Sequence, residues 1–269
     1  MDAYPIGLSL LAGGDRNMPV PEFLKAAKDA GYDGVEMWLV GEGGLNFEVT
    51  DEELASYRQL AADYGLTIYS VAISSPVGNM LATGKDADLF AEYAIRGMDI
   101  AVKLGAKTVL HTTGRLTDDI DYETGYLNGI ANLRKLAPEI EARGLKFALE
   151  FIWNGFLFSP IEMRNFINSV NSPNVGFYLD PGNMAVFQKP QDWVRALKHL
   201  VFQVHLKDWQ GRAVNGGGWT ALLEGQVDYP AVISELRKVG YNGPLVSEVA
   251  LKLAPWEDTA KVMRKVAVM

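Results

Sequence analysis

Four apolar segments in the second half of the chain each finish with a residue that can bind a metal ion or move a proton. The segments Lys-Phe-Ala-Leu-Glu, Gly-Phe-Tyr-Leu-Asp, Phe-Gln-Val-His and Pro-Leu-Val-Ser-Glu end at Glu150, Asp180, His205 and Glu248. One such acid alone could equally cap a helix or pair with a lysine. If the four converge, their burial without a partner would cost on the order of several kcal/mol each. A divalent cation is the simplest compensation.

The ligand types narrow the choice of metal and of chemistry. Oxygen-rich ligation with one histidine suits Mn²⁺, Mg²⁺ or Co²⁺ better than a structural zinc site, with Mn²⁺ the first expectation and Zn²⁺ still open. A metal beside two glutamates suits removal of a proton next to a carbonyl, because the metal acts as a Lewis acid towards the carbonyl oxygen. Crowding by other acids would raise the pKa of a carboxyl and the metal would lower it.

The elements that would position these residues follow a regular alternation. Short runs rich in Val, Ile, Phe and Tyr, mostly apolar on both faces, are typical of parallel strands that are covered on both sides. Between them lie helical patterns, such as residues 51–64, which begin with Thr50 and Glu53 as a capping box, and residues 86–104. The expected strands are residues 4–10, 34–40, 67–73, 107–112, 146–151, 175–180, 201–206 and 244–249.

Eight such runs predict an α/β fold, a single (β/α)₈ TIM barrel over residues 1–269. The spacing is roughly 34 residues per unit, the size of a βα repeat. A glycine stands shortly before several of the expected strands, where a left-handed residue that ends the preceding helix would explain it. These glycines are Gly31, Gly65, Gly105, Gly144 and Gly240. A doubly wound open sheet is the alternative, but the first strand lacks a glycine-rich dinucleotide fingerprint. The active site of a barrel lies at the carboxyl ends of its strands.

Composition excludes several classes of protein. The chain has no cysteine, three histidines and a formal net charge of −8. These numbers argue against disulfide scaffolds, thiolate sites and binding to nucleic acid or to an anionic membrane surface. The chain contains no run of eighteen apolar residues, the length that could span a membrane, and its start lacks a signal-peptide pattern. We therefore expect a cytoplasmic protein.

The motifs around the four site residues resemble the xylose-isomerase-like barrel superfamily. The segments Glu150-Phe-Ile-Trp-Asn and Phe-Ser-Pro-Ile-Glu-Met163 resemble the fifth βα unit of its sugar-phosphate isomerase/epimerase members. Asp180-Pro-Gly-Asn and His205-Leu-Lys-Asp resemble their Asp-x-Gly-Asn and His-x-Lys-Asp motifs, and the segment up to Glu248 resembles their closing strand. The similarity spans the chain and is strongest from Phe147 onward.

The resemblance implies a metal-dependent isomerase or epimerase that acts on a ketose or ketose phosphate, most simply by epimerisation at C3. In ketose 3-epimerases the two glutamates that correspond to Glu150 and Glu248 ligate the metal and exchange the proton through a metal-stabilised enediolate. Aldose–ketose isomerisation uses the same intermediate, and a lyase of the inosose dehydratase type starts with the same step. A nuclease of the same fold needs a histidine-rich site that this chain lacks. Family barrels commonly form dimers or tetramers, so a homodimer or homotetramer is an expectation that rests on the resemblance alone.

Further residues at expected strand ends are candidates for substrate contact. Glu36 and Trp38 end the second strand, Trp153 follows Glu150, and His111 ends the fourth strand. Aromatic walls suit the apolar faces of a sugar, although aromatic residues at a barrel mouth are often plain packing. His111 could equally support another site residue or be a structural histidine.

Three residues near the motifs complete the candidate site. Lys207 either lines the site or pairs with Asp208, and Arg212 either binds a hydroxyl or phosphate of the substrate or is a solvated loop residue. Asn183 stands where free-ketose 3-epimerases often carry histidine, and Phe156 stands where they carry an acid. These departures favour the sugar-phosphate branch or an unusual substrate.

Overall fold

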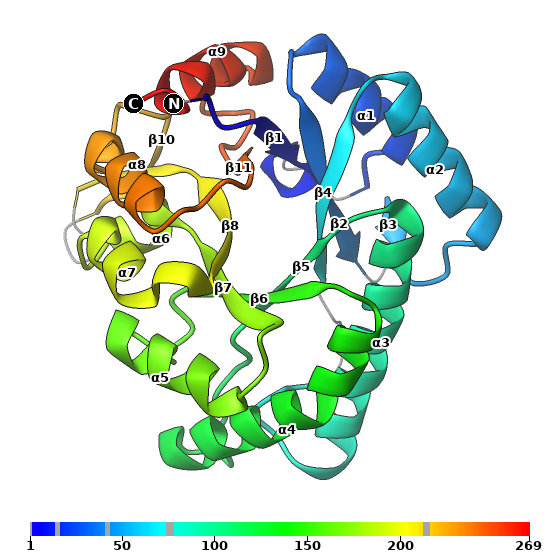
Figure 1. Ribbon diagram of the computed structural model, residues 1–269, viewed down its shortest axis with the longest axis vertical. Helices are drawn as coiled ribbons and strands as arrows, with labels where there is room; N and C mark the ends of the chain where they lie inside the picture. The colour runs from blue at the N-terminus through cyan, green and yellow to red at the C-terminus, as the bar shows by residue number, and fades with distance from the viewer. Residues whose placement is uncertain (1, 14–16, 41–43, 74–77, 212–215) are drawn as a thin grey trace.

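Eight parallel strands form a closed barrel in the computed structural model, which describes residues 2–13, 17–40, 44–73, 78–211 and 216–269. The closure is visible in the pairing, because β1 is hydrogen-bonded to both β2 and β11. Figure 1 shows the view down the barrel. The barrel strands are β1 (Ile6–Ser9), β2 (Gly34–Val40), β4 (Thr67–Ile73), β5 (Thr108–Thr112), β6 (Lys146–Glu150), β7 (Val175–Leu179), β8 (Val201–Leu206) and β11 (Leu245–Ser247).

The predicted (β/α)₈ fold is confirmed, and the expected strands differ from the observed ones by a few residues at most. The first strand is shorter than expected, because Leu10 begins a 3₁₀ turn, η1 (Leu10–Gly13). Most strand residues are buried on both faces, as the apolar runs predicted, because one face looks into the barrel and the other packs against helices.

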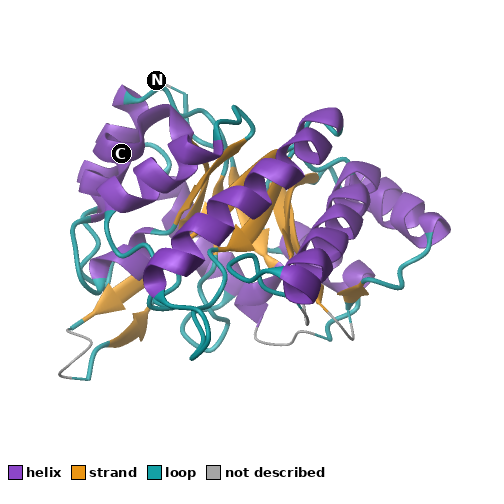
Figure 2. Cartoon of the chain, turned by 90° about the horizontal axis from the view of Figure 1, so that it is seen from below, coloured by secondary structure: helices purple, strands orange, loops and turns teal. Residues whose placement is uncertain are grey.

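The helices lie around the outside of the barrel, as Figures 1 and 2 show. The capping box predicted at Thr50 and Glu53 is present, and the five glycines expected to end helices all have positive φ. No helix in the described ranges is long and apolar enough to cross a membrane. The helices are α1 (Val20–Asp29), α2 (Asp51–Asp63), α3 (Gly84–Leu104), α4 (Tyr122–Ala142), α5 (Pro160–Val170), α6 (Pro181–Ala185), α7 (Pro190–Leu197), η2 (Lys198–Leu200), α8 (Tyr229–Lys238) and α9 (Trp256–Val266).

Two additions to the barrel lie outside the βα repeat. A short strand, β3 (Leu45–Asn46), pairs with the end of β2. An antiparallel hairpin is formed by β9 (Asp208–Gln210) and β10 (Gly218–Thr220), directly after β8. Figure 2 shows this hairpin at the end of the molecule opposite to the two chain termini. It therefore extends the rim at which the barrel strands end.

Candidate metal centre and active site

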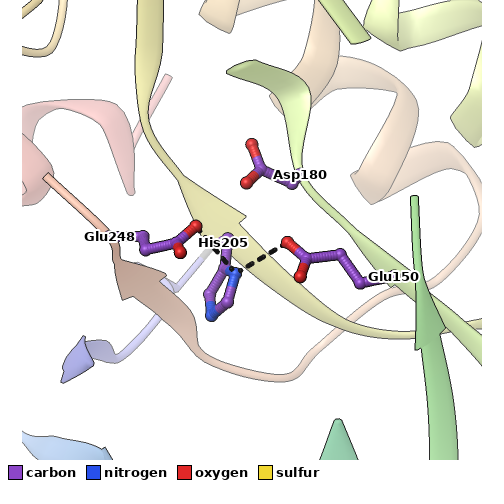
Figure 3. A group of neighbouring side chains, drawn as sticks. All are labelled: Glu150, Asp180, His205 and Glu248. Carbon is purple, nitrogen blue, oxygen red and sulfur yellow. Dashed lines mark hydrogen bonds and ion pairs between the residues drawn. The ribbon is translucent and has the colours of Figure 1, made fainter. Parts of the chain in front are cut away.

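The structure brings Glu150, Asp180, His205 and Glu248 together at the carboxyl ends of β6, β7, β8 and β11. One ligand atom from each lies within 4.8 Å of all the others. Figure 3 shows Glu150 and Glu248 on opposite sides of His205, with Asp180 between them at the upper edge. The convergence follows from the fold, because the ends of adjacent parallel strands meet at one rim of a barrel.

The buried carboxylates of this cluster are those that a cation would satisfy. Asp180 is fully buried, and its Oδ1 accepts a hydrogen bond from the Asn183 amide at the start of α6. Its Oδ2 is buried without a hydrogen-bond partner, although Lys207 Nζ lies 2.9 Å away as an ion pair. Burial raises the pKa of the Glu150 and Asp180 carboxyls, so their charged forms need compensation. Three carboxylates and an imidazole therefore fit a divalent cation, and a bound cation would return these carboxyls to the ionised form.

The orientation of His205 is set from inside the barrel by Glu36. Glu36 Oε1 lies 2.8 Å from His205 Nε2, on the side away from the other carboxylates. His205 Nδ1 faces Glu150 at 3.3 Å and Glu248 at 3.4 Å. Because Glu36 accepts a hydrogen bond from Nε2–H, Nδ1 is the nitrogen that would bind the metal.

Glu36 itself is held by hydroxyl groups from the neighbouring strands. Ser9 Oγ donates to it at 2.9 Å, Ser70 Oγ at 2.7 Å and Tyr178 Oη at 2.6 Å. Burial alone would raise the pKa of Glu36, but the charge and hydrogen bond of His205, with the bonds from Tyr178 and Ser70, bring it below its usual value. Glu36 therefore remains a carboxylate in the barrel interior.

This position differs from the one expected for Glu36. The sequence grouped Glu36 with Trp38 at the end of the second strand, but Glu36 is the third residue of β2, which ends at Val40 as expected and still pairs with β4 through Trp38 and Leu39. Glu36 reaches the bottom of the active-site cavity from the middle of the strand. Its main contacts are with His205 and the interior hydroxyls.

Lys207 balances part of the negative charge at the rim. Its Nζ forms ion pairs with Asp180 and with Glu248, and it lies 4.7 Å from the centre of the Trp219 ring. Burial would lower the pKa of Lys207, but the charges of Asp180, Glu248 and Glu150 raise it, so the amine stays protonated. Of the two alternatives for Lys207, the structure shows that it lines the site.

Asp208 binds backbone amides, and not Lys207 as the sequence analysis considered. Its buried carboxylate accepts backbone N–H bonds from Trp209 at 2.9 Å and from Leu223, Gly225 and Val227 at 3.1 Å each. These bonds hold the segment after β10 against the β9–β10 hairpin. Asp208 therefore shapes the rim beside Lys207.

A cavity of about 360 Å³ lies over the cluster, and three tryptophans contribute to its walls. Trp38 comes from β2 and Trp153 from the loop after β6, as expected, while Trp219 on β10 was not anticipated. The Trp153 and Trp219 rings stack with centres 5.2 Å apart and planes 6° apart. Apolar walls with a few converging polar groups are typical of a small-molecule site.

The loop after β6 is arranged so that Trp153 and Glu150 face this cavity. Trp153 adopts a positive φ of 66°, which for a non-glycine residue costs on the order of 1 kcal/mol. Its Nε1 donates to the Asn183 carbonyl at 2.7 Å. The Asn183 side chain donates to the Phe151 carbonyl at 2.9 Å and to Glu150 at 3.4 Å. Asn183 lines the cavity and also holds Glu150 in place.

The remaining candidate residues lie elsewhere or cannot be placed. His111 lines a neighbouring cavity, between Phe90 and Phe147. Arg212 lies outside the described residues. Phe156 is fully buried and packs against Tyr122, so it belongs to the core. Trp219 could have been suspected only from its place after a run of three glycines in the segment that follows the His-x-Lys-Asp motif.

Comparison with known proteins decides the family. The model of the family described as "Xylose isomerase-like TIM barrel" matches residues 24–266. The chain belongs to this family. This match covers most of the chain, so it confirms the resemblance that the sequence motifs indicated.

The curated proteins that are similar to the chain have the names of different enzymes. The chain is 24% identical to a ketose 3-epimerase of Arthrobacter globiformis, over 84% of this chain and 75% of the relative. It is also 24% identical to a 3-dehydroshikimate dehydratase of Pseudomonas putida strain KT2440, over 90% of this chain but only 38% of the relative's length. Among solved structures, the IolI protein with a bound zinc atom superposes with a TM-score of 0.80 at 18% identity, covering 98% of this chain and 96% of that one. The last likeness shows the fold.

Replacing Glu36 with glutamine should weaken metal binding by about 10- to 100-fold, because a neutral amide is a weaker partner for the His205 Nε2–H. Titration with Mn²⁺, followed by the EPR signal of the free ion, measures the dissociation constant without any substrate. Ser70→Ala is the matched control, since it removes one donor to Glu36 but leaves the bond to His205. An unchanged Mn²⁺ affinity in a Glu36→Gln protein with normal circular dichroism would contradict this role.

Proposed function

We propose that the protein is a metal-dependent epimerase that acts at C3 of a ketose or ketose phosphate. The observation that carries this proposal is the placement of two glutamates, Glu150 buried and Glu248 partly buried, on opposite sides of one cluster. Epimerisation removes a proton from one face of a carbon and returns a proton to the other face, which requires two bases that face each other across the substrate. Glu150 and Glu248 would be these two bases.

Glu150, Asp180, His205 and Glu248 would hold the cation. When bound, it would polarise the ketose carbonyl and offset the negative charge that develops on its oxygen. Burial raises the pKa of Glu150 and a bound cation would lower it again, so the loaded site would hold this glutamate as a carboxylate that can accept a proton. Lys207 keeps Glu248 and Asp180 in place through its two ion pairs.

The cavity supports a monosaccharide-sized substrate. Its volume of about 360 Å³ lies at the lower end of the range for small-molecule sites. Trp38, Trp153 and Trp219 offer flat apolar surfaces for the C–H faces of a sugar ring or chain. The ketose 3-epimerase among the relatives agrees with this substrate class.

A lyase of the dehydratase type is the second candidate, favoured by the dehydratase relative that aligns with 90% of this chain. It would begin with the same removal of a proton beside a carbonyl. The two reactions then diverge, because a lyase expels a hydroxyl group from the neighbouring carbon as water. Product analysis therefore separates them.

Proton exchange in D₂O tests the proposal. The protein is loaded with Mn²⁺ or Co²⁺, incubated with a panel of ketoses and ketose phosphates, and freed of paramagnetic metal before NMR spectra are recorded. We expect deuterium at C3 together with the C3 epimer. Deuterium at C1 or C2 with an aldose product would indicate an aldose–ketose isomerase, and an unsaturated product would indicate a lyase. Absence of exchange across the panel would overturn the assignment to ketoses.

A further inference from the structure

A second cavity, of about 250 Å³, adjoins the active-site cavity at the carboxyl ends of β4, β5 and β6. Ile73, Thr112 and Ile152 line both cavities, so the two cavities adjoin along these residues. We call it the side cavity; its polar side chains come from Asn79, His111, Thr112, Arg115 and Asn154. A substrate bound over Glu150, Asp180, His205 and Glu248, which we call the metal cluster, could extend a group into this space.

The charge of the side cavity is opposite to that of the metal cluster. Among the described residues that line it, Arg115 is the one that carries a charge, and none is Asp or Glu. Within the part of the chain that the structure describes, no carboxylate oxygen lies within 4 Å of the Arg115 guanidinium, whereas Lys207 at the rim is engaged by two acids. A positive side chain with a free guanidinium is thus set apart from the acidic centre.

The loop that carries Arg115 is held by the side-chain amides of Asn79, which is buried, and Asn154, which is partly buried. The Asn79 side chain donates to the Arg115 carbonyl at 2.7 Å and accepts from the Arg115 amide at 3.1 Å. The Asn154 side chain donates to the Gly114 carbonyl and to Thr113 Oγ1. Gly114 has a φ of +81°, and a Cβ there would lie 2.7 Å from Met80 Cγ. The loop is therefore pre-organised, which reduces the entropic cost of binding a ligand.

His111 is a second polar side chain in the side cavity, and its ring is neutral. Burial lowers its pKa, and its Nδ1 lies 2.7 Å from the Thr112 carbonyl. The neutral ring therefore donates from Nδ1 and keeps Nε2 as an acceptor. This arrangement suits a ligand hydroxyl next to a group that Arg115 binds.

We propose that the side cavity is the subsite for an anionic group, a phosphate or a carboxylate, at the end of the substrate chain remote from its carbonyl. The guanidinium of Arg115 would bind the anion with paired N–H donors. The separation from Glu150, Asp180 and Glu248 limits the repulsion that an anion would meet over the metal cluster itself. The link to a ketose chain rests on the proposed function, whereas anion binding by the side cavity does not.

Histidine NMR tests the subsite directly, because the chain has three histidines in separate surroundings. His111 lies in the side cavity, His205 in the metal cluster and His199 before β8 at another cavity. The protein is loaded with diamagnetic Zn²⁺ and titrated with inorganic phosphate, acetate, ribulose 5-phosphate and ribulose. We expect phosphate or acetate to shift the His111 ring signals in a saturable way while His199 is unmoved, and the stronger of the two identifies the anion.

The variant Arg115→Gln should weaken binding of that anion by about 10- to 100-fold, the loss expected for charge-assisted hydrogen bonds. Binding of ribulose should change less than threefold. Arg58→Gln on the exposed side of α2 is the matched control, because it removes the same charge far from the cavity. Anion shifts confined to His205, or equal affinity in wild-type and Arg115→Gln protein, would overturn the subsite. These binding results stand apart from the exchange assay, so failure of turnover with retained anion binding would refute the ketose reaction and leave the subsite intact.

Discussion

Glu248→Gln protein should lose about 10²- to 10⁴-fold in turnover, the contribution of a positioned acid or base. Glutamine keeps the shape of the side chain and one oxygen ligand, so we expect the fold and most of the metal binding to remain. Epimerisation rates on the best substrate, with Mn²⁺ content from atomic emission, measure both quantities. Glu92→Gln, an exposed change on α3, is the matched control for the loss of one acid.

A partial reaction makes this prediction sharper. Glu150 and Glu248 lie on opposite sides of the cluster, so in the proposed reaction each would serve one face of C3. The Glu248→Gln protein should therefore still exchange the C3 proton of one epimer with D₂O while it fails to exchange the other and fails to convert either. Near-normal epimerisation, or an equal loss of exchange for both epimers with metal still bound, would contradict the two-base arrangement.

Removal of the metal should abolish activity and also lower the thermal stability. A ligand present at 100 times its dissociation constant stabilises a protein by about 2.7 kcal/mol, which corresponds to a fall of about 5 °C in Tm when it is withdrawn. The physical reason is that Glu150, Asp180 and Glu248 then face one another with only Lys207 and His205 to balance them. Dialysis against a chelator, followed by calorimetry and activity assays, tests both effects.

Restoration experiments identify the metal and provide the control. Mn²⁺, Co²⁺, Mg²⁺ and Zn²⁺ are added back singly, and the ion that restores both activity and Tm at the lowest concentration is the functional one. His205→Ala protein should recover neither, since it lacks the one nitrogen ligand of the cluster. Full activity in protein that holds less than a few hundredths of a metal ion per chain would refute a metal-dependent reaction.

The barrel could be predicted from the sequence because strands covered on both sides read as unbroken apolar runs. The metal cluster could be predicted for a related reason. Glu150, Asp180 and Glu248 are the first ionisable residues after such runs, and His205 is the polar residue near the end of its own. In a parallel barrel the end of a strand in the sequence is also its end in space, so linear position alone places these four side chains at one rim.

Other parts of the site depend on packing that the linear order does not contain. The contact between Glu36 and His205 crosses the barrel interior and depends on strand tilt and register. The register of β2 against β4 shifts between Val35 and Glu36. Trp219 reaches the cavity only because the β9–β10 hairpin folds over the rim. The direction of His111, into the side cavity, follows from its packing between Phe90 and Phe147.

The hydrogen bonds of Glu36 have a consequence for how such a protein can change. One carboxylate joins side chains of β1, β2, β4, β7 and β8, and it supports the metal-binding histidine from within the barrel. Trp153, Trp219 and Arg115, by contrast, lie on loops or on the outlying hairpin. In the proposed function, the histidine that would bind the cation and much of the substrate-binding wall would thus belong to separate parts of the chain. Loop exchange, in evolution or in the laboratory, can therefore redirect the enzyme to a new substrate while its metal chemistry is inherited unchanged.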